Sequence, residues 1–220
     1  MTNDKKIKLK INGKSVEVDK GTTILEAAKT LDIYIPTLCY HPLLEPYAAC
    51  RVCVVEVQEK GRSNLVTSCN NKVREGMEVQ TDSETAVKAR TLNVEMLMAQ
   101  APAAEVVQEI ARKMGIEKTR FGISDPNEKC ILCGLCVRAC QEIIGKSAIS
   151  LVNRGIYKEV AAPFYAYELS GDCIGCGDCA FVCPTGAIEM GEDGRPNLPK
   201  VRIPYAEIEA MMKKESLATS

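Results

Sequence analysis

The spacing of the cysteines constrains this chain more than any other feature of its sequence. Twelve cysteines occur in 220 residues, and they form three groups of four with none left over. Two groups share the spacing C-x2-C-x2-C-x3-C, whereas the first has the spacing C-x10-C-x2-C-x15-C. Such dense C-x2-C units are typical of metal ligation. The groups are Cys39, Cys50, Cys53 and Cys69; Cys130, Cys133, Cys136 and Cys140; and Cys173, Cys176, Cys179 and Cys183.

Disulfide bonds and structural zinc are the alternative uses of so many cysteines. The N-terminal residues MTNDKKIKLK contain neither an apolar segment nor a small-residue cleavage site, so they predict no secretion signal. We therefore expect a cytoplasmic protein, in which thiols stay reduced. Zinc sites usually pair two C-x2-C units across a longer gap, and two runs of four cysteines fit that pattern poorly.

The two runs with identical cysteine spacing predict a pair of 4Fe-4S clusters. In runs of this spacing, three thiolates bind one cluster from a single loop and the fourth reaches the other cluster. We expect Gly134, Gly175 and Gly177 to let these loops turn tightly. Pro184 follows the second run, whereas Gln141 takes that place after the first. The predicted ligand sets are Cys130, Cys133, Cys136 and Cys183 for one cluster, and Cys173, Cys176, Cys179 and Cys140 for the second.

The two runs also belong to an internal repeat. CILCGLCVRACQ, residues 130–141, and CIGCGDCAFVCP, residues 173–184, agree in the four cysteines, one isoleucine and one glycine. An Ala-Ile pair follows each run, at residues 148–149 and 187–188, and marks a short strand. The sequence therefore predicts a duplicated unit of loop, helix and strand.

Charge and hydropathy exclude two classes of protein. The chain has 28 basic and 29 acidic side chains and a formal net charge of -1, so no basic excess predicts binding to nucleic acid or to a membrane surface. The longest stretch without a formal charge, residues 33–44, is far shorter than the roughly 20 apolar residues of a spanning helix. We expect no membrane span.

Residues 1–81 have the pattern of a β-grasp domain. Apolar residues alternate on either side of the turn dipeptide Asn12-Gly13, which predicts a β-hairpin. Thr23 and Glu26 form a capping box before a helical pattern. Three further strands are predicted at residues 52–57, 65–67 and 77–80. The fold class is therefore α+β, with one helix packed on a mixed sheet.

The rest of the chain divides into three further sections. Residues 82–118 predict a helical connector, with Thr81 and Glu84 as a second capping box and a second helix over residues 103–114 that ends at Gly115. This section has no Cys or His, and its apolar positions predict a packed core. Residues 119–200 predict a bacterial-type dicluster 4Fe-4S ferredoxin domain, and residues 201–220 form a tail in which residues 206–214 could form an amphipathic helix.

A resemblance sharpens the interpretation of the first cysteine group. The segment PTLCYHPLLEPYAACRVCVVEV, residues 36–57, resembles the N-terminal 2Fe-2S domain shared by the large iron-sulfur subunit of complex I, the diaphorase of NAD-linked bidirectional hydrogenases and iron-only hydrogenases. The resemblance implies that Cys39, Cys50, Cys53 and Cys69 bind a 2Fe-2S cluster, with Arg51 in the CRxC position of the family. The single histidine, His41, is expected to be a loop residue near the cluster and not a ligand, because the cysteine set is complete.

The resemblance covers about residues 7–195, and the chain departs from it in two places. Relatives commonly carry one histidine and three cysteines for an additional 4Fe-4S cluster, whereas here MAQAPAAEVVQEIARKMG, residues 98–115, has none of them. The chain also ends near residue 220, without the catalytic domain of such relatives. We therefore expect a truncated member that lacks this intervening cluster.

The sequence contains no motif for dinucleotide binding, phosphate binding or nucleophilic catalysis. We therefore predict a non-catalytic electron-transfer subunit that relays single electrons through one 2Fe-2S and two 4Fe-4S clusters. The resemblance implies an NAD(P)H-oxidising partner that holds FMN, with a thioredoxin-like 2Fe-2S subunit and a further redox subunit as additional partners. The assemblies considered are hydrogenase, formate dehydrogenase, ferredoxin oxidoreductase and electron-bifurcating transhydrogenase. A freestanding ferredoxin-like carrier and a structural zinc module remain as alternatives.

Overall fold

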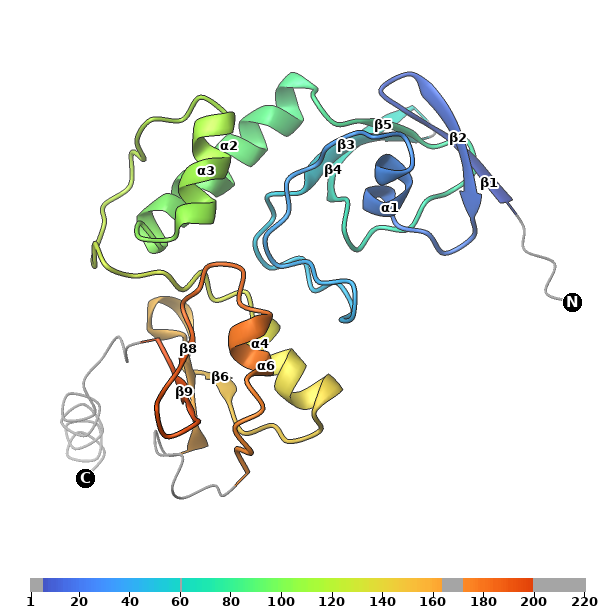
Figure 1. Ribbon diagram of the computed structural model, residues 1–220. Helices are drawn as coiled ribbons and strands as arrows, with labels where there is room; N and C mark the ends of the chain where they lie inside the picture. The colour runs from blue at the N-terminus through green and yellow to red at the C-terminus, as the bar shows by residue number, and fades with distance from the viewer. Residues whose placement is uncertain (1–5, 60, 164–171, 200–220) are drawn as a thin grey trace, which may run out of the picture. The chain divides into compact units, whose positions relative to one another are not determined.

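The structure is a computed structural model that describes residues 6–59, 61–163 and 172–199 (Figure 1). The chain divides into two compact units, Met1–Cys133 and Gly134–Ser220. None of the helices in the described ranges is long and apolar enough to cross a membrane.

The first unit is built on a five-stranded mixed sheet with the strand order β2-β1-β5-β3-β4. β1 pairs with β2 in an antiparallel hairpin and with β5 in parallel, while β3 pairs antiparallel with both β4 and β5. Asn12 and Gly13 have φ angles of 50° and 78°, as the predicted hairpin turn requires. The strands are β1 (Lys6–Ile11), β2 (Lys14–Asp19), β3 (Val54–Glu59), β4 (Arg62–Thr67) and β5 (Glu78–Gln80).

Helix α1 (Ile24–Lys29) lies against this sheet (Figure 1). Its capping box is confirmed, because the Thr23 side chain accepts from the Glu26 N–H and the Glu26 carboxylate accepts from the Thr23 N–H at 2.8 Å. The helix buries its apolar side chains in the core that the sheet provides. This arrangement is the predicted β-grasp fold. The fully enclosed core residues include Ile11, Ile24, Leu25, Val55, Met77 and Val79.

The predicted helical section begins at α2 (Glu84–Gln100), but its cap differs from the prediction. Ser83 caps the helix by accepting a hydrogen bond from the Ala86 N–H at 3.2 Å. Thr81, predicted as the cap, is 1% exposed, and its hydroxyl instead accepts from the Asn12 side-chain amide at 2.7 Å. The predicted capping box at Thr81 is therefore wrong, because Thr81 belongs to the end of the sheet.

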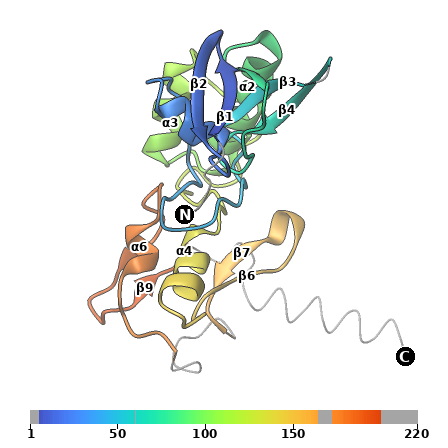
Figure 2. The same ribbon diagram turned by 90° about the vertical axis from the view of Figure 1, so that its right-hand side faces the viewer.

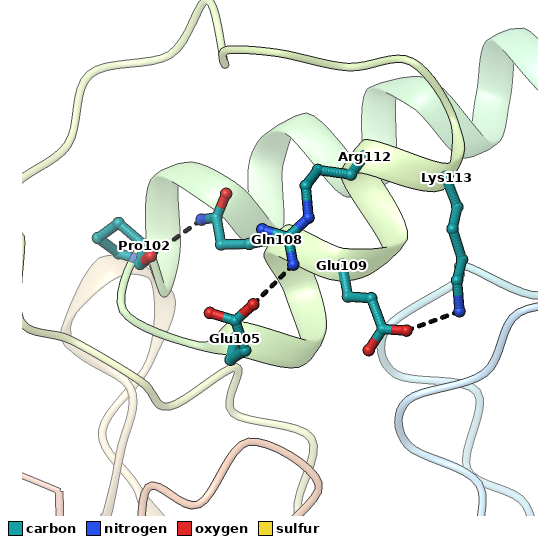
Figure 3. A network of polar contacts seen from close by, with 6 residues as sticks. All are labelled: Pro102, Glu105, Gln108, Glu109, Arg112 and Lys113. Carbon is teal, nitrogen blue, oxygen red and sulfur yellow. Dashed lines mark hydrogen bonds and ion pairs between the residues drawn. The ribbon is translucent and has the colours of Figure 1, made fainter.

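Helix α3 (Glu105–Lys113) packs beside α2, and both helices contribute buried apolar side chains. The exposed face of α3 carries ion pairs, Arg112 with Glu105 at 2.6 Å and Lys113 with Glu109 at 2.7 Å (Figure 3). Such exposed pairs stabilise a helix only slightly, so burial is the main stabilising contribution. The buried residues of the hairpin and its turn are Val94, Leu97, Met98, Ala101, Ala104, Val107, Ile110 and Ala111.

The second unit consists of very short elements arranged in the predicted repeat. Each copy has a four-residue helix that begins after a left-handed glycine, α4 after Gly134 and α6 after Gly177. Strands β6 and β8 begin directly after the two Ala-Ile pairs, and β6 and β7 form a hairpin (Figure 2). The helix predicted over residues 206–214 lies outside the described residues. The elements are α4 (Leu135–Arg138), the π-helix η1 (Ala139–Ile143), β6 (Ser150–Val152), the 3-10 helix η2 (Gly155–Tyr157), β7 (Glu159–Ala161), α6 (Asp178–Phe181), β8 (Glu189–Met190) and β9 (Pro196–Asn197).

Candidate metal-cluster sites

The first cysteine group is gathered by the loops at one end of the β-grasp sheet. Cys39 and Cys50 lie in the long loop between α1 and β3, Cys53 directly precedes β3, and Cys69 follows β4. Their residues are between 1% and 7% exposed. Arg51, between the second and third cysteines, has a φ of 54°, so the backbone turns sharply within the CRxC segment.

The four sulfurs lie as two contacting pairs. The Cys50 N–H donates to Cys39 Sγ at 3.4 Å. The side-chain hydrogen bond between Cys39 and Cys50 lowers the pKa of Cys50 to about 6 and raises the pKa of Cys39. A corresponding bond between Cys53 and Cys69 lowers the pKa of Cys53 to about 7 and raises the pKa of Cys69. In each pair one thiol donates to its neighbour and thereby favours a thiolate on that neighbour.

All four thiols are close enough to influence one another. Beyond its bond to Cys53 and its burial, Cys69 has its pKa raised by charge on Cys39 and Cys50. Two pairs of thiolates are the ligands that a two-iron centre takes, one pair for each iron. Across the described ranges, no three His, Cys, Asp or Glu side chains converge as ligands of one metal ion.

Two buried polar atoms beside this group have no hydrogen-bond partner. They are Ser68 Oγ, in a residue that is 0% exposed, and Arg90 Nε, in a residue that is 8% exposed. Ser68 directly precedes Cys69, and although its hydroxyl forms no hydrogen bond of good geometry, it lies close enough to Cys53 to contribute, after the larger effect of Cys69, to the lowered pKa of that thiol. Buried donors without partners are uncommon, and a sulfur-rich anionic group at these cysteines would accept from them. The residues therefore fit a 2Fe-2S cluster.

Sequence reasoning missed both Ser68 and Arg90. A signal for Arg90 was available, because it occupies an apolar position of the α2 pattern, between buried Ala86 and Val94. A charged residue at such a position must have a compensating environment. Ser68 gave no signal beyond its position next to a cysteine.

His41, the single histidine, is half-buried in the loop that follows Cys39. Its Nδ1 accepts a long hydrogen bond from the Leu43 N–H at 3.4 Å. The imidazole thus stabilises the turn of the loop through one ring nitrogen. This contact gives His41 a structural role that does not require it to be a ligand.

In the second unit, one small cavity is lined by four cysteines from two separate segments. Cys140 comes from η1, Cys173 and Cys176 come from the loop that leads into α6, and Cys179 lies in α6 itself. Cys183 does not line this cavity. Burial raises the pKa of Cys179 to about 11, and charge on Cys176 and Cys140 adds to that rise. The cavity thus collects the set of cysteines predicted for the second 4Fe-4S cluster.

At equivalent places in the two repeats, a backbone N–H group donates to the sulfur of the fourth cysteine of the run. The Ala148 N–H donates to Cys140 Sγ at 3.3 Å, and the Ala187 N–H donates to Cys183 Sγ at the same distance. These alanines begin the two Ala-Ile pairs that the sequence aligns. Amide donors of this kind stabilise thiolate charge and influence the potential of a bound cluster.

The backbone restricts which residue two positions of the second unit can accept. Gly175 has a φ of 68°, and a Cβ there would lie 2.5 Å from the Gly194 carbonyl oxygen. Gln141, which stands where the second run has Pro184, lies within η1. A proline at Gln141 would remove a backbone donor from the π-helical turn, so the repeat departs from symmetry at this residue for a local reason.

The predicted ligands of the first 4Fe-4S cluster belong to both units. Cys130 and Cys133 lie at the C-terminal end of the first unit, whereas Cys136 on α4 and Cys183 after α6 belong to the second. Within the first unit, the Gln100 side-chain amide donates to the Cys130 carbonyl at 3.2 Å, and the Leu132 N–H donates to Cys130 Sγ at 3.4 Å. The end of α2 therefore holds the start of this run.

Comparisons with known proteins place both cysteine regions in described domain families. Residues 4–84 match the 2Fe-2S iron-sulfur cluster binding domain, and residues 129–187 match the 4Fe-4S dicluster domain. In structure, the chain is similar to a chain of the NAD+-reducing [NiFe]-hydrogenase in the H2-reduced state, with a TM-score of 0.69 and 31% identity. That likeness covers 82% of this chain and 85% of the hydrogenase chain.

Three curated relatives are longer proteins. The NADP-reducing hydrogenase subunit HndD of Solidesulfovibrio fructosivorans is 38% identical over 81% of this chain and 35% of its own length. The NADPH-Fe(3+) oxidoreductase subunit alpha of Geobacter sulfurreducens is 35% identical over 83% and 24%. A subunit of the NADH-quinone oxidoreductase of Rhizobium meliloti is 32% identical over 83% and 24%. The chain thus spans about a third or a quarter of these relatives.

Proposed function

The chain belongs to the iron-sulfur family that joins an N-terminal 2Fe-2S domain to a 4Fe-4S dicluster domain, and from this premise we propose that it relays single electrons within an NAD(P)H-linked oxidoreductase complex. The observation that carries the proposal is the gathering of cysteine thiols into separate ligand sets. One set forms two pairs beside the β-grasp sheet, and another lines a cavity in the second unit.

We propose that the 2Fe-2S cluster is held by the first cysteine group, with Cys39 and Cys50 on one iron and Cys53 and Cys69 on the other. The contacts within each pair support this division. For the dicluster domain we propose the crossed assignment. The cavity lined by Cys140 together with the second run supports it. The ligand sets are Cys130, Cys133, Cys136 and Cys183 for one cluster, and Cys173, Cys176, Cys179 and Cys140 for the other.

The polypeptide contributes burial, ligand geometry and hydrogen-bond donors. Bound clusters supply one-electron redox chemistry. The N–H groups of Cys50, Leu132, Ala148 and Ala187 donate to cysteine sulfurs and thereby stabilise negative charge at the sites. Burial of the first cysteine group excludes water, which strengthens the hydrogen bond from the Cys50 N–H to Cys39 Sγ.

We further propose that electrons reach the chain from a partner subunit that oxidises NAD(P)H with a bound flavin. The names of the relatives support this, because they are subunits of NADP-reducing hydrogenase, NADPH-Fe(3+) oxidoreductase and NADH-quinone oxidoreductase. A flavin can divide a hydride into two single electrons, which suits one-electron carriers. A thioredoxin-like 2Fe-2S subunit and a further redox subunit complete the proposed assembly, in the cytoplasm.

Anaerobic isolation of the native protein tests this proposal. We expect a brown preparation with about ten irons per chain, the content of one 2Fe-2S and two 4Fe-4S clusters. A flavoprotein that oxidises NAD(P)H should copurify. A brown chain that purifies alone would favour a freestanding ferredoxin-like carrier, and a colourless preparation containing zinc would contradict the cluster assignment.

A further inference from the structure

Helix α2 carries a buried, charged side chain that contacts the backbone next to the first cysteine group. Arg90 is 8% exposed, and its Nη2 donates to the Val54 carbonyl at 3.0 Å and to the Thr81 carbonyl at 2.9 Å. Val54 is the neighbour of Cys53 in the chain. The guanidinium is therefore held at a fixed place on the backbone segment that carries Cys53.

The positive charge of Arg90 is not neutralised by an ion pair. Among the residues that the structure describes, no carboxylate forms a salt bridge with it, and its Nε has no hydrogen-bond partner. Lys88, two residues earlier on the same helix, is different, because its side chain is 74% exposed and pairs with Glu84. Within the described residues, the Arg90 guanidinium is thus shielded from solvent and has no carboxylate in ion-pair contact.

A guanidinium loses hydration free energy when it is buried, so a negative group must compensate. Burial lowers the pKa of Arg90, and charge on Asp82, Cys53 and Tyr34 opposes that effect. Asp82 and Tyr34 are exposed to solvent, where their charges are screened. Cys53 is 1% exposed, so of these three groups it is the one that is enclosed in the protein together with Arg90.

A second contact from α2 holds the other side of Cys53. The Asn93 side-chain amide donates to the Arg51 carbonyl at 3.0 Å. Arg90 and Asn93 lie three residues apart on the helix, so they project from the same side. Together they fix the backbone before and after Cys53, and the position of the charge relative to the sulfur is correspondingly rigid.

We propose that Arg90 is a positioning residue that raises the reduction potential of the 2Fe-2S centre. This inference rests on the proposed function, because it requires a cluster on Cys39, Cys50, Cys53 and Cys69. The centre becomes one charge more negative when it accepts an electron. A fixed cation in a water-excluded site stabilises the reduced form more than the oxidised form.

The test compares three variants of the full chain, within its complex, by anaerobic potentiometric titration of the 2Fe-2S electron paramagnetic resonance signal. Arg90→Gln keeps amide donors for the two carbonyls but removes the charge. Arg90→Lys keeps the charge. Lys88→Gln removes an exposed charge from the same helix and serves as the matched control.

We expect Arg90→Gln to shift the reduction equilibrium at least tenfold toward the oxidised form, which corresponds to about 59 mV for one electron. Arg90→Lys should retain most of the wild-type potential, and Lys88→Gln should match the wild type. A wild-type potential in Arg90→Gln would overturn the proposal. Loss of the cluster in both Arg90 variants would also overturn it, since Arg90 would then only hold the loop.

The result also separates this inference from the proposed function. A wild-type chain without a 2Fe-2S signal would refute the cluster assignment, and the role of Arg90 with it. A wild-type chain with the signal, together with unshifted Arg90 variants, would refute the role of Arg90 alone.

Discussion

At the scale of single residues, the first candidate site contains buried polar atoms for which the described part of the chain supplies no hydrogen-bond partner. Ser68 Oγ is the clearest example, because its residue is fully enclosed and adjoins Cys69. A buried hydroxyl without a hydrogen bond is destabilising by about 1–3 kcal/mol. A sulfur acceptor at the site removes that penalty.

Ser68→Ala is therefore expected to affect the 2Fe-2S centre and not the fold. Loss of the hydroxyl removes a donor to sulfur, so the reduction potential should fall while the iron content stays unchanged. Spectroscopic redox titration measures the shift. Ser63→Ala is the matched control, because Ser63 is an exposed residue of β4 whose hydroxyl contacts Glu56. Equal potentials in the two variants would argue against a contact between Ser68 and the cluster.

Cys140→Ser tests the crossed ligand assignment at the same scale. Because Cys140 lines the cavity with Cys173, Cys176 and Cys179, its substitution should damage the cluster bound by those three residues. We expect loss of about one 4Fe-4S cluster, measured by iron content and by low-temperature electron paramagnetic resonance. Cys183→Ser should remove the other cluster signal instead. If Cys140→Ser abolished the signal assigned to Cys130, Cys133 and Cys136, the crossed assignment would be incorrect.

At the scale of elements, the second unit depends on tight turns before very short helices. α4 and α6 have four residues each, and both begin after a glycine in the left-handed conformation. Helices of this length are not stable by themselves. The loops and the groups that they bind must therefore supply the stability.

Gly175→Ala should disrupt the loop that carries the second cysteine run. The new Cβ would lie 2.5 Å from the Gly194 carbonyl oxygen, and the left-handed backbone adds a cost of about 1–2 kcal/mol. We expect a lower melting temperature, measured by calorimetry, and the loss of one 4Fe-4S cluster, measured by iron analysis. Gly145→Ala is the control, since Gly145 has a φ of 73° but nothing within 4 Å of its Cβ position. A Gly175 variant no less stable than this control would show that the close approach is unimportant.

At the scale of the whole molecule, the two units differ in how they are stabilised. The first has a five-stranded sheet, the helices α1, α2 and α3, and a continuous apolar core. The described part of the second has two-stranded sheets and single helical turns. Small units without a large core commonly depend on bound metal for folding.

Removal of the clusters should therefore affect the two units unequally. We expect the apo chain to lose hydrogen-exchange protection in α4, η1, β6, β7 and α6, while β1, β3 and β5 stay protected. Hydrogen exchange followed by mass spectrometry, on anaerobic holo protein and on chelator-treated protein, measures this difference. Uniform loss of protection in both units would contradict the prediction.

Much of this organisation could be predicted from the sequence, because it depends on residues close together in the chain. The hairpin at Asn12-Gly13, the capping box at Thr23 and the glycine turns at Gly134 and Gly177 are local features, and the structure confirms them. Cysteine spacing likewise indicated cluster ligation, since three ligands of a cubane cluster come from one short loop.

Only the tertiary structure decided which polar side chains are enclosed. Thr81 was mistaken for a helix cap because its hydrogen-bond partner Asn12 is 69 residues away in the chain. Arg90 meets the Val54 carbonyl across 36 residues. Local pattern cannot reveal such contacts, because burial of a side chain depends on which distant segments pack around it. The sequence thus determined where the candidate ligands lie in the chain, and the packing of α2 on β3 decided that Arg90 is buried at the Val54 carbonyl.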